Sequence, residues 1–189
     1  IIELYLELMH HGSVFKMVVA TAALENNTIT TKTTVNDTGI YPRGHNPACW
    51  IYTSRHYGHG YLNVTEAIKK SCNYFFYELG YKMGIDPVIK YAKSYGLGIK
   101  TGIELSGESK GIVDLKDYCK ETTGQEWQFG DTLSAVIGQS YNSYTPIQIA
   151  RYTSMLANGG KSVDVTLIKS IIDLSLIHIS EPTRRSYIS

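Results

Sequence analysis

The strongest constraint on the fold is an apolar run with helical spacing, Val14 to Leu24, which begins directly after Gly12 and Ser13. Turn-forming residues, Glu25-Asn26-Asn27, follow the run, so the sequence predicts a helix with Ser13 at its start. Lys16 lies three residues after Ser13 on the same helix face, where its amine could take the serine proton. The pair is a candidate acylation centre, although a helix-capping Ser13 with a surface Lys16 explains the same residues.

A second helical run extends from Asn63 to Met83, and Ser71-Cys72-Asn73 interrupts it near the middle. A short interruption between two helical halves can turn polar side chains into a cleft. There Ser71 would relay a proton and Asn73 would hold substrate. Ser140-Tyr141-Asn142 has the same pattern, and a polar helix face is the simpler explanation for Ser71 and Asn73 taken alone.

Composition excludes several classes of function. The 189 residues are 43% apolar, which is enough for one domain with a substantial core. A net charge of +1, from 18 basic and 17 acidic residues, argues against a nucleic-acid partner. The three cysteines, Cys49, Cys72 and Cys119, have no metal-ligand spacing and are interpreted as structural thiols. No apolar stretch is long enough to span a membrane.

The rest of the chain has weaker patterns. Thr28 to Asp37 is rich in Thr, Val and Ile, which favours a strand, and Val163 to Ile172 is also strand-like. Further helices are predicted over Val88 to Tyr95 and over Thr145 to Leu156. Residues 106–130 are polar, with weak periodicity, and predict no element.

These motifs resemble the transpeptidase domain of class B penicillin-binding proteins, specifically the elongation-type enzymes. The motif set of penicillin-binding proteins is Ser-x-x-Lys, Ser-Asp-Asn and Lys-Thr-Gly. This chain has Ser13-Val14-Phe15-Lys16 and Ser71-Cys72-Asn73, with Cys72 in place of Asp. The resemblance covers residues 12–170. Its wider segments are Gly12 to Met17, Pro47 to Trp50, Gly58 to Ala67, Gly96 to Gly98, Thr101 to Leu105 and Ile137 to Pro146.

The resemblance implies an α/β (α+β) serine transpeptidase or β-lactamase-like fold, incomplete in this chain, with a helical subdomain and part of an antiparallel sheet. It also implies a penicillin-binding peptidoglycan D,D-transpeptidase that cross-links stem peptides through an acyl-serine intermediate and is acylated by β-lactams. In that reaction Ser13 is the nucleophile and Lys16 its base. Ser71 relays a proton, and Asn73 holds the substrate amide and the lysine. No cofactor and no metal are implied.

A location and partners follow from the same resemblance. The protein is expected at the extracytoplasmic face of the bacterial cell membrane, with its anchor outside this chain. Its full-length form is expected to act with cell-wall elongation proteins. The alternative is a penicillin-sensing receptor domain, which has the same motifs and is acylated without transferring the acyl group. The sequence of the whole gene would distinguish the two.

Lys100-Thr101-Gly102 spells the third motif of the family but directly follows a helix-ending turn at Gly96-Leu97-Gly98. In the family the motif stands on an edge strand, well after the segment found here at Gly138-Gln139. Lys100 is therefore interpreted as a surface residue in a structural connection. The true third motif is expected beyond the region of resemblance.

The C-terminal end of the chain does not resemble the family. Leu174 to Arg184 resembles the translation of a sequencing adapter rather than natural protein, and the alternative is an alternating strand over Leu174 to Ile179. The sequence therefore predicts a partial transpeptidase domain over residues 1–173 and a non-native tail over residues 174–189. A polypeptide truncated in this way is expected to be inactive.

Overall fold

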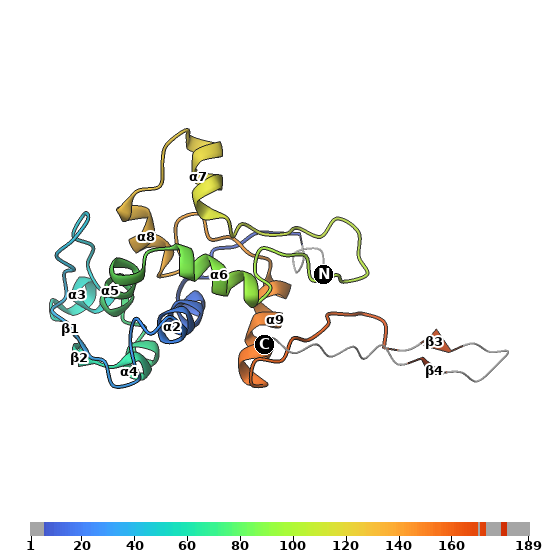
Figure 1. Ribbon diagram of the computed structural model, residues 1–189, viewed down its shortest axis with the longest axis horizontal. Helices are drawn as coiled ribbons and strands as arrows, with labels where there is room; N and C mark the ends of the chain where they lie inside the picture. The colour runs from blue at the N-terminus through green and yellow to red at the C-terminus, as the bar shows by residue number, and fades with distance from the viewer. Residues whose placement is uncertain (1–5, 170, 173–178, 181–189) are drawn as a thin grey trace. The chain divides into compact units, whose positions relative to one another are not determined.

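The computed structural model describes residues 6–169, 171–172 and 179–180 (Figure 1). Helices predominate among these residues, and the named strands form short antiparallel pairs. The chain divides into two compact units, which are described separately. The motif unit comprises residues 10–92 and 112–142, and the terminal unit comprises residues 1–9, 93–111 and 143–189.

The motif unit is built around one central helix, α5 (Asn73–Met83), which packs against α2, α4, α8 and β1 (Figure 1). Phe75, Phe76 and Leu79 of α5 are fully buried, and each such side chain contributes about 1.5–3 kcal/mol of transfer free energy. This packing fixes the start of α5. The other elements of the unit are η1 (Gly12–Phe15), α2 (Lys16–Glu25), β1 (Val35–Asp37), α3 (Trp50–Arg55), β2 (Gly60–Leu62), α4 (Val64–Lys69), α6 (Asp86–Ser94), α7 (Leu115–Thr123) and α8 (Phe129–Ala135).

The strand predicted over Thr28 to Asp37 is wrong for most of its length. Only Val35–Asp37 pairs, antiparallel to β2, with Val35 opposite Leu62 and Asp37 opposite Gly60. Before it, Thr33 closes a turn, because its hydroxyl accepts a hydrogen bond from Thr30 N and its own N–H donates to Thr30 O. Threonine hydroxyls compete with strand pairing in this way, which composition alone does not show.

The helices with clear end signals are confirmed. Asn63 caps α4 through a capping box with Glu66, and α4 and α5 are separate helices divided at residues 70–72, as predicted. The helix predicted over Val88 to Tyr95 is α6. In contrast, two helices were not predicted. The helix α7 lies within the weakly periodic segment 106–130, and α8 begins at the end of that segment. Their short apolar faces are interrupted by polar residues, so no run was long enough to stand out.

The terminal unit contains α9 (Pro146–Ala157) and the paired strands β3 (Ile171–Ile172) and β4 (Ile179–Ser180). Thr145 caps α9 as predicted. The buried Gln148 donates from Nε2 to Ile99 O and Lys110 O, both at 2.9 Å, and so ties two loops to the helix. The strand predicted over Val163 to Ile172 is wrong up to residue 169, because that segment has no strand pairing.

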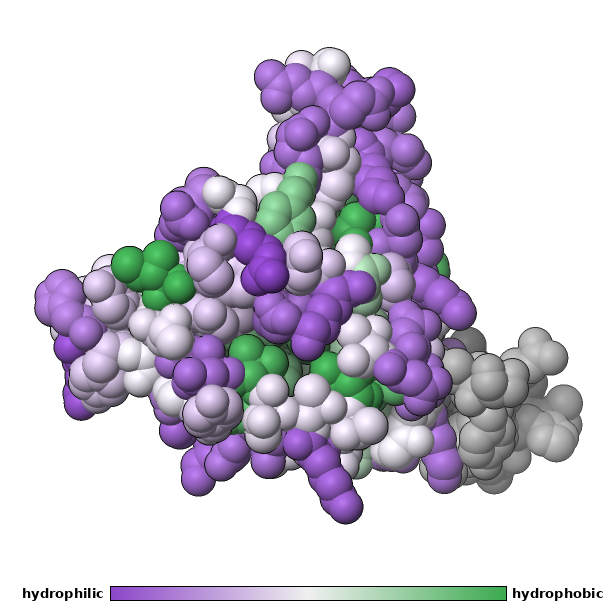
Figure 2. Space-filling model, turned by 60° about the vertical axis from the view of Figure 1, so that its left-hand side comes forward, coloured by the Kyte–Doolittle hydropathy of each residue, from purple (hydrophilic) through white to green (hydrophobic). Residues whose placement is uncertain are grey.

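On the face drawn in Figure 2, polar residues predominate and apolar residues lie in small separate groups. Within the described part of the chain, no helix has the length and apolar character that crossing a membrane requires. The predicted boundary between residues 173 and 174 and most of the predicted tail lie outside the described residues, so this division stays a prediction.

Candidate active site

Ser13 lies in the second position of η1, directly after a tight backbone crossing. Gly12 has φ +51° and donates its N–H to Gly138 O at 3.2 Å. A side chain on Gly138, which has φ +79°, would overlap the carbonyl of Gly12. Two glycines far apart in sequence therefore meet here, and their contact fixes the start of the helix that holds Ser13.

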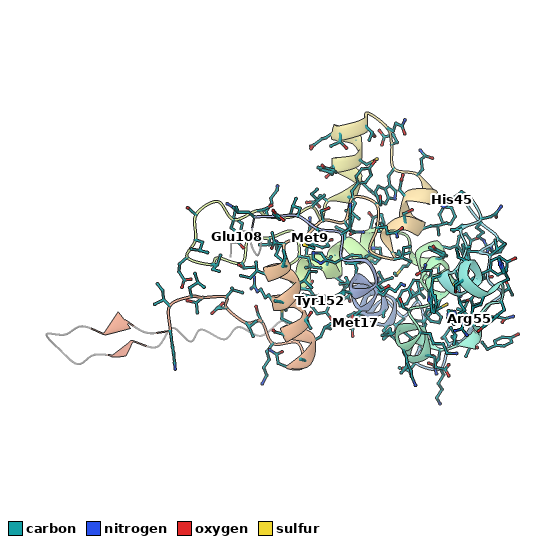
Figure 3. All side chains as sticks on the ribbon, turned by 180° about the vertical axis from the view of Figure 1, so that it is seen from behind. Met9, Met17, His45, Arg55, Glu108 and Tyr152 are labelled. Carbon is teal, nitrogen blue, oxygen red and sulfur yellow. The ribbon has the colours of Figure 1, made fainter. Side chains whose placement is uncertain are left out.

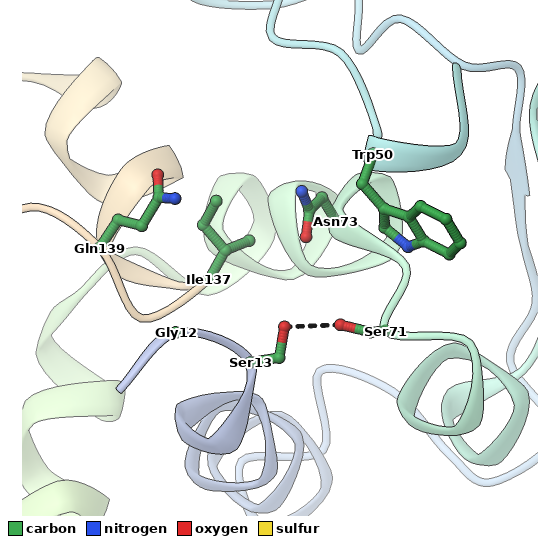
Figure 4. A pocket seen from close by; sticks show the side chains of 7 residues that line it. All are labelled: Gly12, Ser13, Trp50, Ser71, Asn73, Ile137 and Gln139. Atoms are coloured by element: carbon green, nitrogen blue, oxygen red, sulfur yellow. Dashed lines mark hydrogen bonds between the residues drawn. The ribbon is translucent and has the colours of Figure 1, made fainter. Parts of the chain in front are cut away.

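The hydroxyl of Ser13 is hydrogen-bonded to two other candidate residues. Ser13 Oγ lies 2.6 Å from Ser71 Oγ, and Lys16 Nζ lies 3.1 Å from Ser13 Oγ and 2.9 Å from Ser71 Oγ. Figure 4 shows Ser13 and Ser71 facing each other across the site. The structure therefore brings the serine, its candidate base and the candidate relay within direct proton-transfer distance.

Lys16 is almost fully buried, with 2% of its surface exposed. Its Nζ also contacts Asn73 Oδ1 at 2.6 Å and Ser71 O at 2.9 Å, and it lies 5.7 Å from the centre of the Phe76 ring. An ammonium group has three protons for these four oxygen contacts. A neutral amine could instead accept a proton from one of the two hydroxyls.

Burial lowers the pKa of Lys16 from 10.5 to about 8, although negative charge on the nearby thiols of Cys49 and Cys72 would raise it. A lysine with this pKa is partly neutral near pH 7 to 8. Burial thus makes Lys16 a usable general base for Ser13, as the same lysine on a protein surface would not be.

Ser71 is held in place by the way α4 ends. Its N–H donates to Ile68 O, and the N–H of Cys72 donates to Ala67 O, which is the hydrogen-bond pattern of a Schellman motif. Ser71 occupies the left-handed position of that motif, with φ +50°, where glycine is usual. A serine in this conformation costs about 1 kcal/mol, and the turn aims its hydroxyl and carbonyl at Lys16.

The other tripeptide of the same pattern, Ser140-Tyr141-Asn142, has a structural arrangement. The buried Asn142 donates from Nδ2 to Ala135 O and Gln139 O, both at 2.9 Å, and so holds the turn that follows α8. Among the described contacts, only the first tripeptide is hydrogen-bonded to Lys16, through the side chains of Ser71 and Asn73.

A groove opens beside Ser13. A cavity of about 340 Å³ is lined by Gly12, Ser13, Trp50, Ser71, Asn73, Ile137 and Gln139 (Figure 4). A second cavity, of about 530 Å³, shares Trp50, Asn73, Ile137 and Gln139 and extends to Thr53, Ser54 and Tyr77. Trp50 is 45% exposed, and its indole N–H donates to Lys70 O at 3.0 Å, which fixes the ring at the wall. Sequence reasoning placed Trp50, Ile137 and Gln139 in segments that resemble the family but did not identify them as groove residues, because their convergence beside Ser13 depends on the fold.

A cluster of potential metal ligands lies behind the site. One ligand atom from each of Asp37, Cys49, His59 and Cys72 falls within 4.8 Å of the others. His59 Nδ1 lies 2.7 Å and Cys72 Sγ 3.2 Å from Asp37 Oδ2. This mixture of nitrogen, sulfur and carboxylate ligands is of the kind that binds zinc. Local sequence patterns do not indicate this cluster, because its four members come from separate segments and the spacing of the cysteines is uninformative.

The side chains of this cluster change one another's pKa values. Burial opposes ionisation of Asp37, but hydrogen bonds from His59, from the Gly39 N–H and from Cys72 lower its pKa overall. The hydrogen bond between the two sulfurs lowers the pKa of Cys49 and raises that of Cys72, which burial raises further.

The segment Lys100-Thr101-Gly102 lies in a loop, as expected for a structural connection, and the interpretation that the third motif lies elsewhere stays a prediction. The N–H and hydroxyl of Thr101 both donate to Glu108 Oε1 at 2.6 Å, and Gly102 N donates to Glu108 Oε2 at 3.1 Å. Figure 3 shows Glu108 in the same loop region of the terminal unit. Lys100 is exposed, so this motif-like sequence is a structural connection.

Comparisons with known proteins agree with the motifs. The family model "Penicillin binding protein transpeptidase domain" matches residues 7–187. "Peptidoglycan D,D-transpeptidase MrdA" of Haemophilus influenzae is 35% identical over 163 residues, which cover 85% of this chain and 24% of the relative. The protein of the same name from Escherichia coli K12 is 34% identical over 149 residues, 79% of this chain and 23% of the relative. The chain thus spans about a quarter of the length of these relatives.

Solved structures give the same result. A complex between PBP2 and MreC from Helicobacter pylori has a TM-score of 0.80 and 34% identity over 87% of this chain and 30% of that one. Pseudomonas aeruginosa PBP2 in complex with WCK 5153 has a TM-score of 0.81 and 31% identity over 94% of this chain and 41% of that one. The predicted α/β serine transpeptidase fold is therefore confirmed. None of these four relatives is named as a sensor. This chain belongs to the family of penicillin-binding protein transpeptidase domains.

Proposed function

We propose that this chain contains the acyl-transfer centre of a penicillin-binding peptidoglycan D,D-transpeptidase. The observation that supports this most is the hydrogen-bonded set of Ser13, Lys16, Ser71 and Asn73 beside an open groove. A serine becomes a nucleophile only when a base can take its proton. The buried Lys16 is such a base, and it contacts both hydroxyls.

The first half-reaction transfers a peptide to Ser13. Neutral Lys16 takes the hydroxyl proton as Ser13 Oγ bonds to the carbonyl carbon of the penultimate D-Ala of a stem peptide. The Ser13 N–H supplies one donor to the oxyanion of the tetrahedral intermediate. When the C–N bond breaks, the proton passes from Lys16 through the Ser71 hydroxyl to the departing amine. Terminal D-Ala leaves, and an acyl ester remains on Ser13.

The second half-reaction uses an amine from a neighbouring stem peptide. The amine attacks the ester carbonyl, Lys16 accepts the amine proton, and the bond to Ser13 Oγ breaks as the oxygen regains that proton. Asn73 holds Lys16 throughout and presents its amide to the substrate backbone. A β-lactam would acylate Ser13 in the same way, but its opened ring stays attached, so no leaving group departs.

We extend the proposal to the setting of the whole protein. The Helicobacter pylori relative has been solved in complex with MreC, which supports a cell-wall elongation partner of that kind for the full-length protein. A peptidoglycan substrate also requires that this domain lie at the extracytoplasmic face of the bacterial cell membrane. Both statements concern a longer protein that contains these residues.

Labelling with a fluorescent penicillin tests the proposal. The 189-residue chain and the natural gene product that contains residues 1–173 are labelled in parallel, each with Ser13→Ala and Ser140→Ala variants. We expect one label per molecule of the gene product, loss of the label in Ser13→Ala and normal labelling in Ser140→Ala. A folded gene product that takes no label, or that labels equally as Ser13→Ala, overturns the proposal.

A transfer assay separates this function from that of a penicillin sensor. The acylated gene product is offered a donor stem peptide together with a second peptide that has a free amine. A transpeptidase releases D-Ala and yields a cross-linked peptide. Acylation by penicillin without D-Ala release or cross-linking would favour the sensor.

A further inference from the structure

Tyr77 lies one helical turn after Asn73, on the same face of α5. It is buried, with 4% of its surface exposed, and it lines the larger cavity of the groove together with Asn73. Burial raises the pKa of Tyr77 to about 12, although a side-chain hydrogen bond with Asn73 lowers it. A hydrogen bond lowers the pKa of a phenol when the phenol oxygen accepts it, so Asn73 Nδ2 donates to Tyr77 Oη.

The opposite end of the same amide faces the reacting groups. Asn73 Oδ1 lies 2.6 Å from Lys16 Nζ, and Figure 4 shows the oxygen of Asn73 turned toward Ser13 and Ser71, with its nitrogen turned away from them. We propose that Tyr77 is a positioning residue for acylation, whose hydroxyl anchors the amide of Asn73 so that Oδ1 stays on Lys16. This role rests on the proposed function, because the orientation of Asn73 affects the rate only if Lys16 is the base.

The orientation of Asn73 decides where the lone pair of Lys16 points. A neutral amine has two N–H groups and one lone pair. Two of the four oxygens that contact Lys16 Nζ, Asn73 Oδ1 and Ser71 O, can only accept hydrogen bonds, whereas the hydroxyls can also donate. When the N–H groups donate to these two oxygens, the lone pair is left for the hydroxyl of Ser13 or Ser71. Proton transfer from Ser13 requires this arrangement.

A loose amide at residue 73 would disturb this arrangement. If the side chain of Asn73 turned about its Cβ–Cγ bond, Nδ2 would face Lys16, and its N–H groups would compete with the serine hydroxyls for the lone pair. Asn73 borders both cavities of the groove, so packing holds it less firmly than a core side chain. Tyr77 is a rigid anchor, because its buried ring packs against Tyr41 at a centroid distance of 5.7 Å. The bond to Tyr77 uses one N–H of Nδ2 and leaves the other available to the substrate backbone.

Removal of a single oxygen atom tests this role. Tyr77→Phe keeps the ring and its packing but leaves Asn73 Nδ2 without its anchor. We expect the second-order rate constant for acylation of the gene product by fluorescent penicillin to fall about tenfold or more. Tyr74→Phe is the matched control, because Tyr74 is 8% exposed, lies on the same helix and packs against the same Tyr41 ring. It should label at the parent's rate. A Tyr77→Phe protein that labels as fast as Tyr74→Phe overturns the inference.

The route through Asn73 is tested in an Asn73→Asp background. An aspartate has an oxygen at both ends of its side-chain group, so it presents an acceptor to Lys16 whichever way it turns. Adding Tyr77→Phe to Asn73→Asp should therefore change the rate of acylation by less than about twofold at a given pH. A further tenfold fall would show that the hydroxyl acts by another route, and would reject the positioning role.

The hydrogen bond itself is tested without labelling. The free energy of unfolding of the 189-residue chain is measured in urea for Tyr77→Phe, for Asn73→Ala and for the double variant. Side chains in direct contact give non-additive changes, so the double variant should lose less stability than the sum of the single ones. The same cycle with Tyr74→Phe should be additive, since neighbouring residues on a helix do not face each other. Additive changes for Tyr77→Phe overturn the inference. If the parent gene product takes no label, the proposed function falls, whereas the cycle still decides whether Tyr77 anchors Asn73.

Discussion

At the residue scale, acylation of Ser13 depends on one buried amine, that of Lys16. Lys16 was predicted from its spacing to Ser13, but spacing could not say that the side chain would be buried. It also could not say that Ser71 and Asn73 would contact it from residues more than fifty positions away. Those contacts depend on how α2 packs against α5, which is a property of the fold.

The pKa of Lys16 leads to a prediction for the pH dependence of acylation. Because the base must be neutral and its pKa is lowered to about 8, the second-order rate constant for penicillin should rise about tenfold per pH unit below 8 and level off above it. Stopped-flow or gel-based labelling from pH 5.5 to 9.5 measures this. A rate that is flat across pH 6 to 9 would show that Lys16 is not the base.

The lowered pKa of Lys16 also affects stability. It makes the free energy of unfolding rise with pH, whereas a lysine whose pKa is raised by an ion pair makes it fall. The pKa of Lys16 is about 8 when folded and about 10.5 when unfolded, so between these values the unfolded chain binds more protons. The free energy of unfolding should therefore rise by up to about 3 kcal/mol from pH 8 to 10.5 through this group. Urea unfolding of the parent and of Lys16→Met isolates the effect, since groups that do not interact with Lys16 cancel in the comparison. Identical pH dependence in both proteins would contradict it.

At the scale of elements, the predictions were most accurate for helices whose ends have local capping signals in the sequence. The capping box at Asn63 and the Thr145-Pro146 start of α9 are local signals, and both helices were predicted. The helix α7 has no capping hydrogen bond from Asp114, and the cluster of Asp37, Cys49, His59 and Cys72 exists only through long-range packing. Neither could be found from local patterns.

The turn between α4 and α5 allows a prediction that separates strain from chemistry. Ser71→Gly and Ser71→Ala both remove the hydroxyl, and each should slow acylation by about 10²- to 10⁴-fold. Only glycine adopts the left-handed conformation of residue 71 without backbone strain. Ser71→Gly should therefore be about 1 kcal/mol more stable than Ser71→Ala. Thermal or urea unfolding measures the difference. Equal stability of the two variants would show that the turn is not strained.

At the scale of the whole molecule, the family and its fold were predictable because several motifs occur in the right order. The terminal unit was predicted less well, since most of residues 163–169 is irregular rather than a strand. The contact that sets the start of η1 joins residues 12 and 138 and was not predicted. It depends on two glycines whose roles appear only when the chain is folded.

That long-range contact yields a prediction with a matched control. Gly138→Ala would bring a Cβ against Gly12 O at φ +79°, so it should cost more than about 2 kcal/mol and lower the acylation rate by displacing Ser13. Gly124 has a similar φ, +71°, but nothing lies near the new Cβ. Gly124→Ala should cost only about 1 kcal/mol and leave the rate unchanged. Equal effects of the two substitutions would contradict the close crossing.

Whether Ser13 is the nucleophile is decided by locating the acylated residue. The gene product that contains residues 1–173 is treated with benzylpenicillin, denatured, digested and analysed by tandem mass spectrometry. We expect one adduct, on Ser13, that is absent in Ser13→Ala and reduced in Lys16→Met. An adduct on any other serine, or none on a folded protein, would contradict it.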